Sequence, residues 1–207
     1  MARKKVSEFR AKTILYSALD IPYFGVEVDS HKNIDEQIYE LDDKKLYVVK
    51  VDQGVKKRGK QGLIKIKVQK SKIKAEIQSL KSKGFEYFLV EEFVEHPQSQ
   101  ERYISFSRTR EGIASTYSAK GGVEIEENKD SIKSFTFPFT TEIADTAAAD
   151  FEKMCKALGV EWEIIQKLIF VFEVNQFAFL ELNPFLIHDK KFLALDAAVE
   201  VDSAAEL

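Results

Sequence analysis

The 207-residue sequence lacks the features that mark secreted and membrane proteins. It contains a single cysteine, Cys155, so it cannot form an intrachain disulfide, and a cytoplasmic location is expected. The basic residues 2–5 are followed by no apolar run, and no window approaches the ~20 consecutive apolar residues of a membrane span. We therefore expect neither a secretory signal nor a membrane partner.

A strong net charge is also absent, because the formal value is only −3. The charge is nevertheless unevenly placed, with ten basic residues and one acid between Lys50 and Lys74 and five acids from Asp189 onward. This asymmetry predicts an anion site in one place and a cation site in another. The basic stretch has no aromatic residue on which bases could stack, so no nucleic-acid partner is expected.

The apolar residues, 44% of the chain with sixteen Phe, are enough for a packed core. Helical spacing and strand-like runs are mixed without a strict strand–helix alternation, which favours an α+β fold over a doubly wound sheet. Residues 128–134 are polar and predict a loop. The expected helices are 7–19, 36–41, 71–83, 146–158 and 161–172, and the expected strands are 23–28, 46–50, 63–68, 87–94, 102–108, 113–119, 177–182 and 192–196, the last two paired.

A lysine and a basic, glycine-containing loop form the candidate anion site. Lys50 ends an apolar strand, where a buried ammonium group needs a partner, and a phosphate group would serve. In residues 56–60, glycine lets the backbone approach an anion and Arg58 can form bidentate bonds to phosphate. The loop lacks the Gly-Lys-Ser/Thr ending of a Walker A motif. A surface lysine at a strand end and a solvated basic turn are the alternatives.

Oxygen-bearing side chains near the C-terminus form the candidate cation site. Asn183 and Asp196 lie on neighbouring expected strands, where an amide oxygen and a carboxylate suit Mg²⁺. Glu181 would share the strand face of Asn183. A hairpin with polar residues at its turn end is an equally good interpretation. The three histidines are too scattered for a metal cluster, and Cys155 is interpreted as a buried structural thiol.

Six segments occur in an order that matches one known family. They are Val48 to Leu63, Leu89 to His96, Thr109 to Gly112, Gly121 to Glu126, Leu180 to Pro184 and Leu195 to Asp202. Together they resemble ATP-citrate lyase and, more loosely, the β subunit of succinyl-CoA synthetase. The match covers residues 7–202, so we interpret the chain as an ATP-grasp unit of an acid–CoA ligase-type enzyme.

The resemblance implies an ATP-grasp fold, with two α+β lobes and a nucleotide cleft between them. The single unit would span 1–207, with a smaller nucleotide-binding lobe over about 20–95 and a larger Mg²⁺-binding lobe over about 96–207, on which helix 7–19 would pack. The implied cofactors are ATP and Mg²⁺. Lys50 and Arg58 would be the catalytic, phosphate-contacting residues, with Gly59, Lys60, Glu91, Glu92, Val94 and Glu101 as further nucleotide contacts and Asn183 and Asp196 as metal ligands. Residues 91–94 would touch adenine mainly through the backbone, and Glu101 would meet the ribose.

The family's chemistry also implies a partner. There, ATP phosphorylates a histidine of another domain, the phosphoryl group passes to a carboxylate, and an acyl-CoA forms. None of the three histidines lies in a glycine-rich loop of that kind, so a partner domain or subunit carrying the phosphohistidine and CoA sites is expected, and hence a hetero-oligomer. Lys120 replaces the usual acid before Gly121-Gly122, so that loop is assigned no role. A stand-alone, non-catalytic ATP-binding module and a succinyl-CoA synthetase β-type fragment are the alternatives.

Overall fold

The chain folds into two compact units, which are described separately. The computed structural model describes residues 3–122, 125, 131–138, 145–188 and 191–202. The small unit comprises Ser7–Arg10 and Pro22–Glu95, and the large unit comprises Met1–Val6, Ala11–Ile21 and His96–Leu207. Helix α1 (Glu8–Ala18) therefore contributes its first turn to the small unit and its remainder to the large one.

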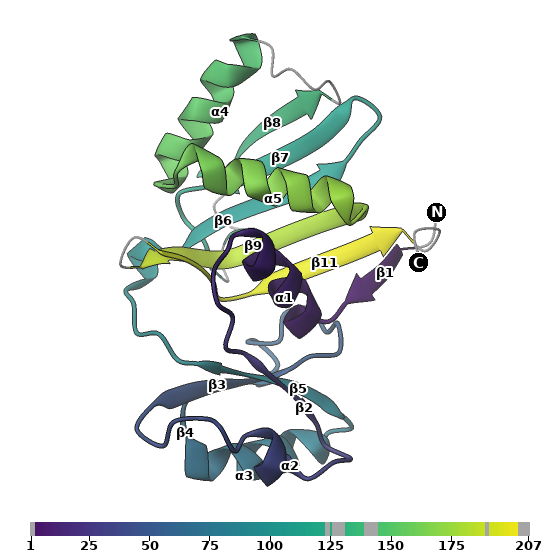
Figure 1. The fold of residues 1–207 in the computed structure, drawn as a ribbon, viewed down its shortest axis with the longest axis vertical. Helices are drawn as coiled ribbons and strands as arrows, with labels where there is room; N and C mark the ends of the chain where they lie inside the picture. The colour runs from purple at the N-terminus through teal and green to yellow at the C-terminus, as the bar shows by residue number, and fades with distance from the viewer. Residues whose placement is uncertain (1–2, 123–124, 126–130, 139–144, 189–190, 203–207) are drawn as a thin grey trace. The chain divides into compact units, whose positions relative to one another are not determined.

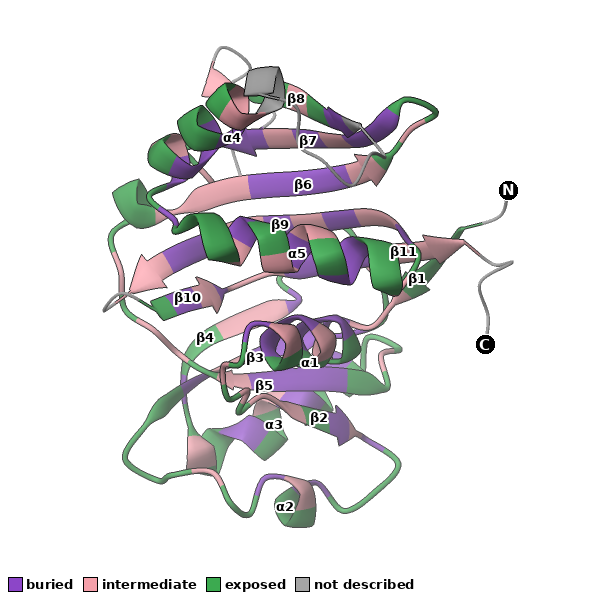
Figure 2. Cartoon of the chain, turned by 45° about the horizontal axis from the view of Figure 1, so that its top comes forward, coloured by how far each residue is buried: buried purple, intermediate pink, exposed green. Residues whose placement is uncertain are grey.

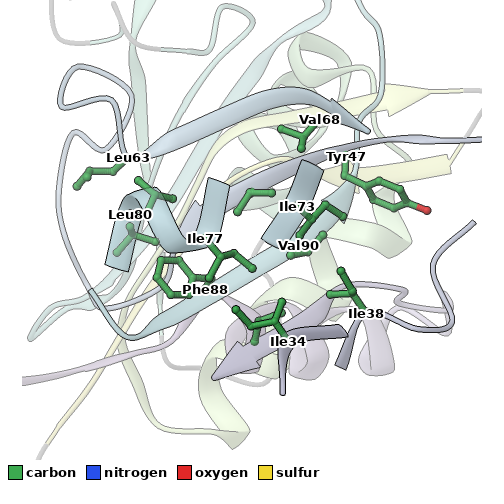
Figure 3. Close-up of a cluster of buried hydrophobic side chains, with 13 residues drawn as sticks. Ile34, Ile38, Tyr47, Leu63, Val68, Ile73, Ile77, Leu80, Phe88 and Val90 are labelled. Carbon is green, nitrogen blue, oxygen red and sulfur yellow. The ribbon is translucent and has the colours of Figure 1, made fainter. Parts of the chain in front are cut away.

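The small unit is a four-stranded antiparallel sheet with helices (Figure 1). The strands are β2 (Val26–Asp29), β3 (Leu46–Val51), β4 (Ile64–Gln69) and β5 (Tyr87–Glu92), in the order β2-β5-β3-β4, and the helices are α2 (Ile34–Gln37) and α3 (Lys70–Lys81). Ile73, Ile77 and Leu80 recur at helical spacing and are fully buried in the core beside Phe88 and Val90 (Figure 3). Gly84 follows α3 with a φ of +93°, a backbone conformation that residues with a side chain rarely adopt.

The large unit is built on a seven-stranded sheet, with the order β1-β11-β9-β6-β7-β8 and β10 paired with β9. Helices α4 and α5 cover one face of this sheet (Figure 1). Figure 2 shows buried residues in the middle portions of the central strands and exposed residues on the outer sides of both helices. The strands are β1 (Arg3–Val6), β6 (Arg102–Arg108), β7 (Gly112–Ser118), β8 (Lys133–Pro138), β9 (Phe177–His188), β10 (Lys191–Ala194) and β11 (Ala197–Asp202), and the helices are η1 (Gln98–Gln100), α4 (Asp145–Leu158) and α5 (Trp162–Val174).

Aromatic side chains join the helices to the large sheet. The ring of Phe106 on β6 lies 6.1 Å from that of Phe172 on α5, and Phe137 on β8 lies 5.5 Å from Phe151 on α4. Each described strand pair in both sheets is antiparallel, as an α+β fold requires. Among the described residues, the helices are too short or too polar to span a membrane.

The sequence predicted most helices and the central strands but missed several edges. Strands β1 and β11 were not expected, and β8 begins inside the expected loop 128–134. The expected strand 192–196 pairs with residues 185–188 rather than with 177–182, which pair with β11. Helix α2 begins before the expected 36–41. Val123, Glu124, Glu126, Asp189 and Lys190 lie outside the described residues.

Candidate functional site

Lys50 lies in the middle of the small sheet. Strand β3 runs between β4 and β5, so Lys50 faces Ile64 on one side and Leu89 on the other. Its side chain is only 6% exposed, and its ammonium group lies 2.8 Å from Glu8 Oε1 and 2.6 Å from Glu91 Oε2. This burial excludes the alternative of a surface lysine, and carboxylates within the protein provide the compensating charge that was expected from phosphate.

Arg58 shares a carboxylate with Lys50. Its guanidinium donates from Nη2 to Glu8 Oε2 at 2.5 Å and from Nη1 to the carbonyl oxygen of Val51 at 2.7 Å. Gly59 and Lys60 follow it in an exposed turn, which the amide of Leu63 closes by donating to the carbonyl of Arg58 at 3.0 Å. The predicted phosphate loop therefore has one buried cation and an exposed, basic tip.

Asp52 fixes the helix that carries Glu8. Its carboxylate accepts the backbone N–H of Glu8 at 2.6 Å and that of Phe9 at 2.9 Å, while Ser7 Oγ accepts that of Arg10 at 3.3 Å. Three amides that α1 itself leaves without partners are thereby satisfied. Burial raises the pKa of the Asp52 carboxyl above its ordinary value, and the two backbone N–H bonds oppose that shift. The sequence had shown only the helix start at Ser7, so Glu8 was missed as a site residue.

The three nucleotide-contact residues predicted near the end of β5 differ in their surroundings. The Glu91 carboxylate accepts the hydroxyl of Tyr23 at 2.9 Å as well as the ammonium of Lys50. Glu92 is exposed and pairs with Lys45 at 2.6 Å, and Val94 is half-buried beyond the strand end. The Glu91 side chain therefore belongs to the internal charge network, and the expected backbone role of residues 91–94 stays a prediction.

In the large unit, Asn183 and Asp196 are neighbours, as predicted. The amide of Asn183 donates to the carbonyl of Asp196 at 3.2 Å, and the amide of Asp196 donates to the carbonyl of Pro184 at 3.2 Å. Asp196 lies in the turn between β10 and β11, and both side chains are partly exposed. Glu181 lies two positions before Asn183 on β9, so both side chains are on the same face of the sheet.

Gly122 connects Asn183 with Glu101. Its N–H donates to Asn183 Oδ1 at 2.7 Å, and a Cβ built on it would lie 2.2 Å from Glu101 Oε2. With a φ of +92°, this position also disfavours a side chain by its backbone. The other oxygen of Glu101 lies 3.2 Å from His96 Nε2. The glycine pair, which was assigned no role from the sequence, thus contacts the predicted metal ligand Asn183 and the predicted ribose contact Glu101.

The oxygen donors of the large unit suit a metal ion that is bound partly by the protein and partly by phosphate and water, rather than one bound by protein ligands alone. The described residues contain no group of three or more His, Cys, Asp and Glu side chains able to hold a metal. Mg²⁺ commonly takes one or two protein oxygens and completes its shell with phosphate and water. Asn183 and Asp196 fit that requirement. Cys155 is buried, as expected, and burial raises the pKa of its thiol to about 11, which argues against a nucleophilic role.

Comparison with known proteins identifies one family. Residues 2–207 match the family described as ATP-citrate synthase ATP-grasp domain. An ATP-citrate synthase alpha chain of Arabidopsis thaliana is 32% identical over 227 residues, which cover 99% of this chain and 52% of that one. A second alpha chain of that plant is 33% identical, with the same coverage. The chain thus spans about half the length of these curated relatives.

Solved structures show the same fold. ATP citrate lyase from Methanothrix soehngenii, in complex with citrate and coenzyme A, has a TM-score of 0.78 and 23% identity, covering 99% of this chain and 52% of that one. The dinucleotide-forming acetyl-coenzyme A synthetase 1 of Ca. Korarchaeum cryptofilum, with coenzyme A and Ca-AMPCP, has a TM-score of 0.67 and 20% identity, covering 96% of this chain and 94% of that one. Another structure of the korarchaeal enzyme contains Mg-AMPPCP and a phosphohistidine segment pointing towards its nucleotide-binding site, with a TM-score of 0.65 and 18% identity, covering 96% and 93%.

Proposed function

Because this chain belongs to the ATP-citrate synthase ATP-grasp domain family, we propose that it binds Mg-ATP and positions the γ-phosphate for transfer to a histidine of a partner domain. The α+β, ATP-grasp fold expected from the sequence is confirmed. The observation that carries the proposal is the convergence of Lys50 and Arg58 on one carboxylate, beside a glycine-containing basic turn. An ammonium and a guanidinium group held by one carboxylate would suit neighbouring oxygens of a phosphate chain, which supports the proposal.

Each predicted residue has a place in this proposal. Lys50 and Arg58 would stabilise the charge on the phosphate chain during transfer, and the turn with Gly59 and Lys60 would contact it through backbone and ammonium groups. Asn183 and Asp196 would hold Mg²⁺, which supplies charge neutralisation on the phosphate oxygens when bound. The backbone of residues 91–94, which include Glu92 and Val94, would contact the adenine base. Glu101 would contact the ribose.

A partner is part of the proposal because this chain spans about half of its relatives. The phosphoryl group would leave ATP for a histidine nitrogen of the partner domain or subunit, with ADP as the leaving group. It would then pass from the histidine to a carboxylate, and CoA would displace inorganic phosphate from the resulting acyl phosphate to give an acyl-CoA. The phosphohistidine segment of the korarchaeal enzyme, which points towards its nucleotide-binding site, supports the first of these transfers. The assembly would be a hetero-oligomer or a longer chain, and we propose that it is cytoplasmic.

Titration calorimetry with ATP tests the nucleotide site. We expect Lys50→Ala and Asp196→Ala each to weaken Mg-ATP binding at least tenfold, because each removes a charged contact worth roughly 1.5–3 kcal/mol. With EDTA in place of Mg²⁺, wild-type affinity should fall, whereas Asp196→Ala should respond little because it has already lost a metal ligand.

Two exposed residues give matched controls. Lys72→Ala removes one positive charge from the small unit, and Glu152→Ala removes one negative charge from the large unit. Both should bind Mg-ATP within about twofold of wild type, because exposed charges away from a site are largely screened. Unchanged affinity in both Lys50→Ala and Asp196→Ala, with each variant folded by circular dichroism, would rule out the proposed site.

A further inference from the structure

We propose that Glu8 is a positioning residue for the phosphate chain, holding Lys50 and Arg58 in place without touching the nucleotide itself. This inference rests on the proposed function, because it concerns the two cations assigned to phosphate. The geometry that supports it lies wholly within the small unit, to which residues 7–10 and 22–95 belong.

Glu8 uses its two carboxylate oxygens for two different cations. Oε1 lies 2.8 Å from Lys50 Nζ and Oε2 lies 2.5 Å from Arg58 Nη2, and the Glu8 side chain is 2% exposed. The two cations come from different places, one from the C-terminal end of β3 and the other from the loop that follows it. A single carboxylate therefore sets the spacing between an ammonium group and a guanidinium group.

The backbone of Glu8 is held as firmly as its side chain. Asp52 accepts the N–H groups of both Glu8 and Phe9, so the first turn of α1 is joined to the residue that directly follows β3. Lys50, two residues earlier, lies on the same strand as Val51, whose carbonyl accepts from Arg58. This closed set of bonds leaves few ways for either cation to move while Glu8 is ionised.

Charge alone predicts the opposite effect of Glu8. Lys50 and Arg58 pair with the carboxylates of Glu8 and Glu91, and the carboxylate of Asp52 accepts the backbone N–H of Glu8. Removing one negative charge from such a group should strengthen the binding of a phosphate chain by simple Coulomb attraction. If Glu8 instead positions the cations, its removal should weaken binding. The sign of the change therefore separates positioning from bulk electrostatics.

The test measures three ligands on wild type and Glu8→Gln: Mg-ATP, magnesium tripolyphosphate and adenosine. We expect Glu8→Gln to weaken Mg-ATP and tripolyphosphate binding by about tenfold or more, because a charge-assisted bond to each cation is lost. Adenosine affinity, followed by ligand-observed NMR, should stay within about twofold, because adenosine has no phosphate group for the two cations to contact. Asp35→Asn, which removes a charge from an exposed pair with Lys74 in the same unit, should leave all three unchanged.

Several outcomes would overturn the inference. Unchanged or tighter Mg-ATP binding by Glu8→Gln, while wild type binds, would refute positioning and leave the proposed function standing. Equal losses for adenosine and ATP would assign Glu8 a purely structural role. Wild type that fails to bind Mg-ATP would refute the proposed function itself. If Glu8→Gln does not fold, Glu8→Asp decides, because it keeps the charge but is too short to reach both cations, so the same selective loss is expected.

Discussion

The two groups of predicted site residues are built on different physical principles. In the small unit, Lys50 and Arg58 are buried and neutralised by carboxylates that surround them. In the large unit, Asn183 and Asp196 are partly exposed and are placed together by backbone hydrogen bonds between β9 and the β10–β11 turn. Electrostatics therefore fixes the first group, whereas sheet register fixes the second.

This difference has consequences for mutation. A buried charge network is sensitive to the loss of any one member, because the remaining charges stay buried without full compensation. A residue placed by backbone bonds can lose its side chain and leave the strand pairing intact. Function and stability should thus be coupled in the small unit and separable in the large one.

Lys50→Ala tests this contrast with the largest expected effect on stability. The variant leaves Glu8 and Glu91 buried without the ammonium that bridges them, so the free energy of unfolding should fall by roughly 3–5 kcal/mol. Asp196→Ala, at a partly exposed position, should lower it by about 1 kcal/mol or less. Urea unfolding followed by circular dichroism measures both. Equal losses in the two variants would erase the distinction between the two regions.

Gly122 tests how closely the predicted site residues of the large unit are packed, and two glycines of the small unit serve as comparisons. Gly122 combines a φ of +92° with a Cβ clash against Glu101, Gly62 has a φ of +65° without a clash, and Gly59 has neither. Substitution by alanine should therefore cost roughly 2–3 kcal/mol at Gly122, about 1 kcal/mol at Gly62 and about 0.5 kcal/mol or less at Gly59. Urea unfolding gives the order, and Gly122→Ala no worse than Gly62→Ala would show that Glu101 simply moves aside.

Asp52 provides the smallest and most specific test, through pH. Burial raises the pKa of this carboxyl in the folded state, so the folded protein binds a proton at a pH where the unfolded chain has already released it. This group therefore favours folding more as pH falls from neutral toward its ordinary pKa of 3.8. The Asp52→Asn variant has no titratable group at this position. Its deficit in unfolding free energy relative to wild type should therefore grow as the pH falls from 7 to 4. A constant deficit would contradict a buried, titrating Asp52.

Local periodicity explains which elements the sequence predicted correctly. Helix α3 was predicted because Ile73, Ile77 and Leu80 recur on one helical face, and that face is the one buried. Strand β4 shows the limit of this reasoning, since Ile66 alternates with Lys65 and Lys67 in the sequence yet is 62% exposed. The register of β3 against β4 shifts between Tyr47 and Val49, and Lys67 adopts a φ of +56°, so the alternation of faces is broken there.

Edge strands and outer helix faces carried weaker signals. Strand β1 has the sequence Arg-Lys-Lys-Val and joins β11 through backbone bonds, which any residue other than proline can donate. Phe170 is 63% exposed on α5, because its neighbours Phe172 and Val171 occupy the buried face. Composition alone therefore determines neither whether an edge segment joins a sheet nor which side of a helix faces the core.

The sequence by itself determined the family, most helices and central strands, and the neighbouring positions of Asn183 and Asp196, because ordered motifs and apolar spacing are local properties. Only the tertiary structure decided the partners of Lys50. Glu8 and Glu91 lie 42 and 41 residues away in sequence, yet both oxygens are within 2.8 Å of its ammonium group. A buried charge is compensated by whichever distant carboxylate the fold brings into contact, and no local pattern in the chain records that choice.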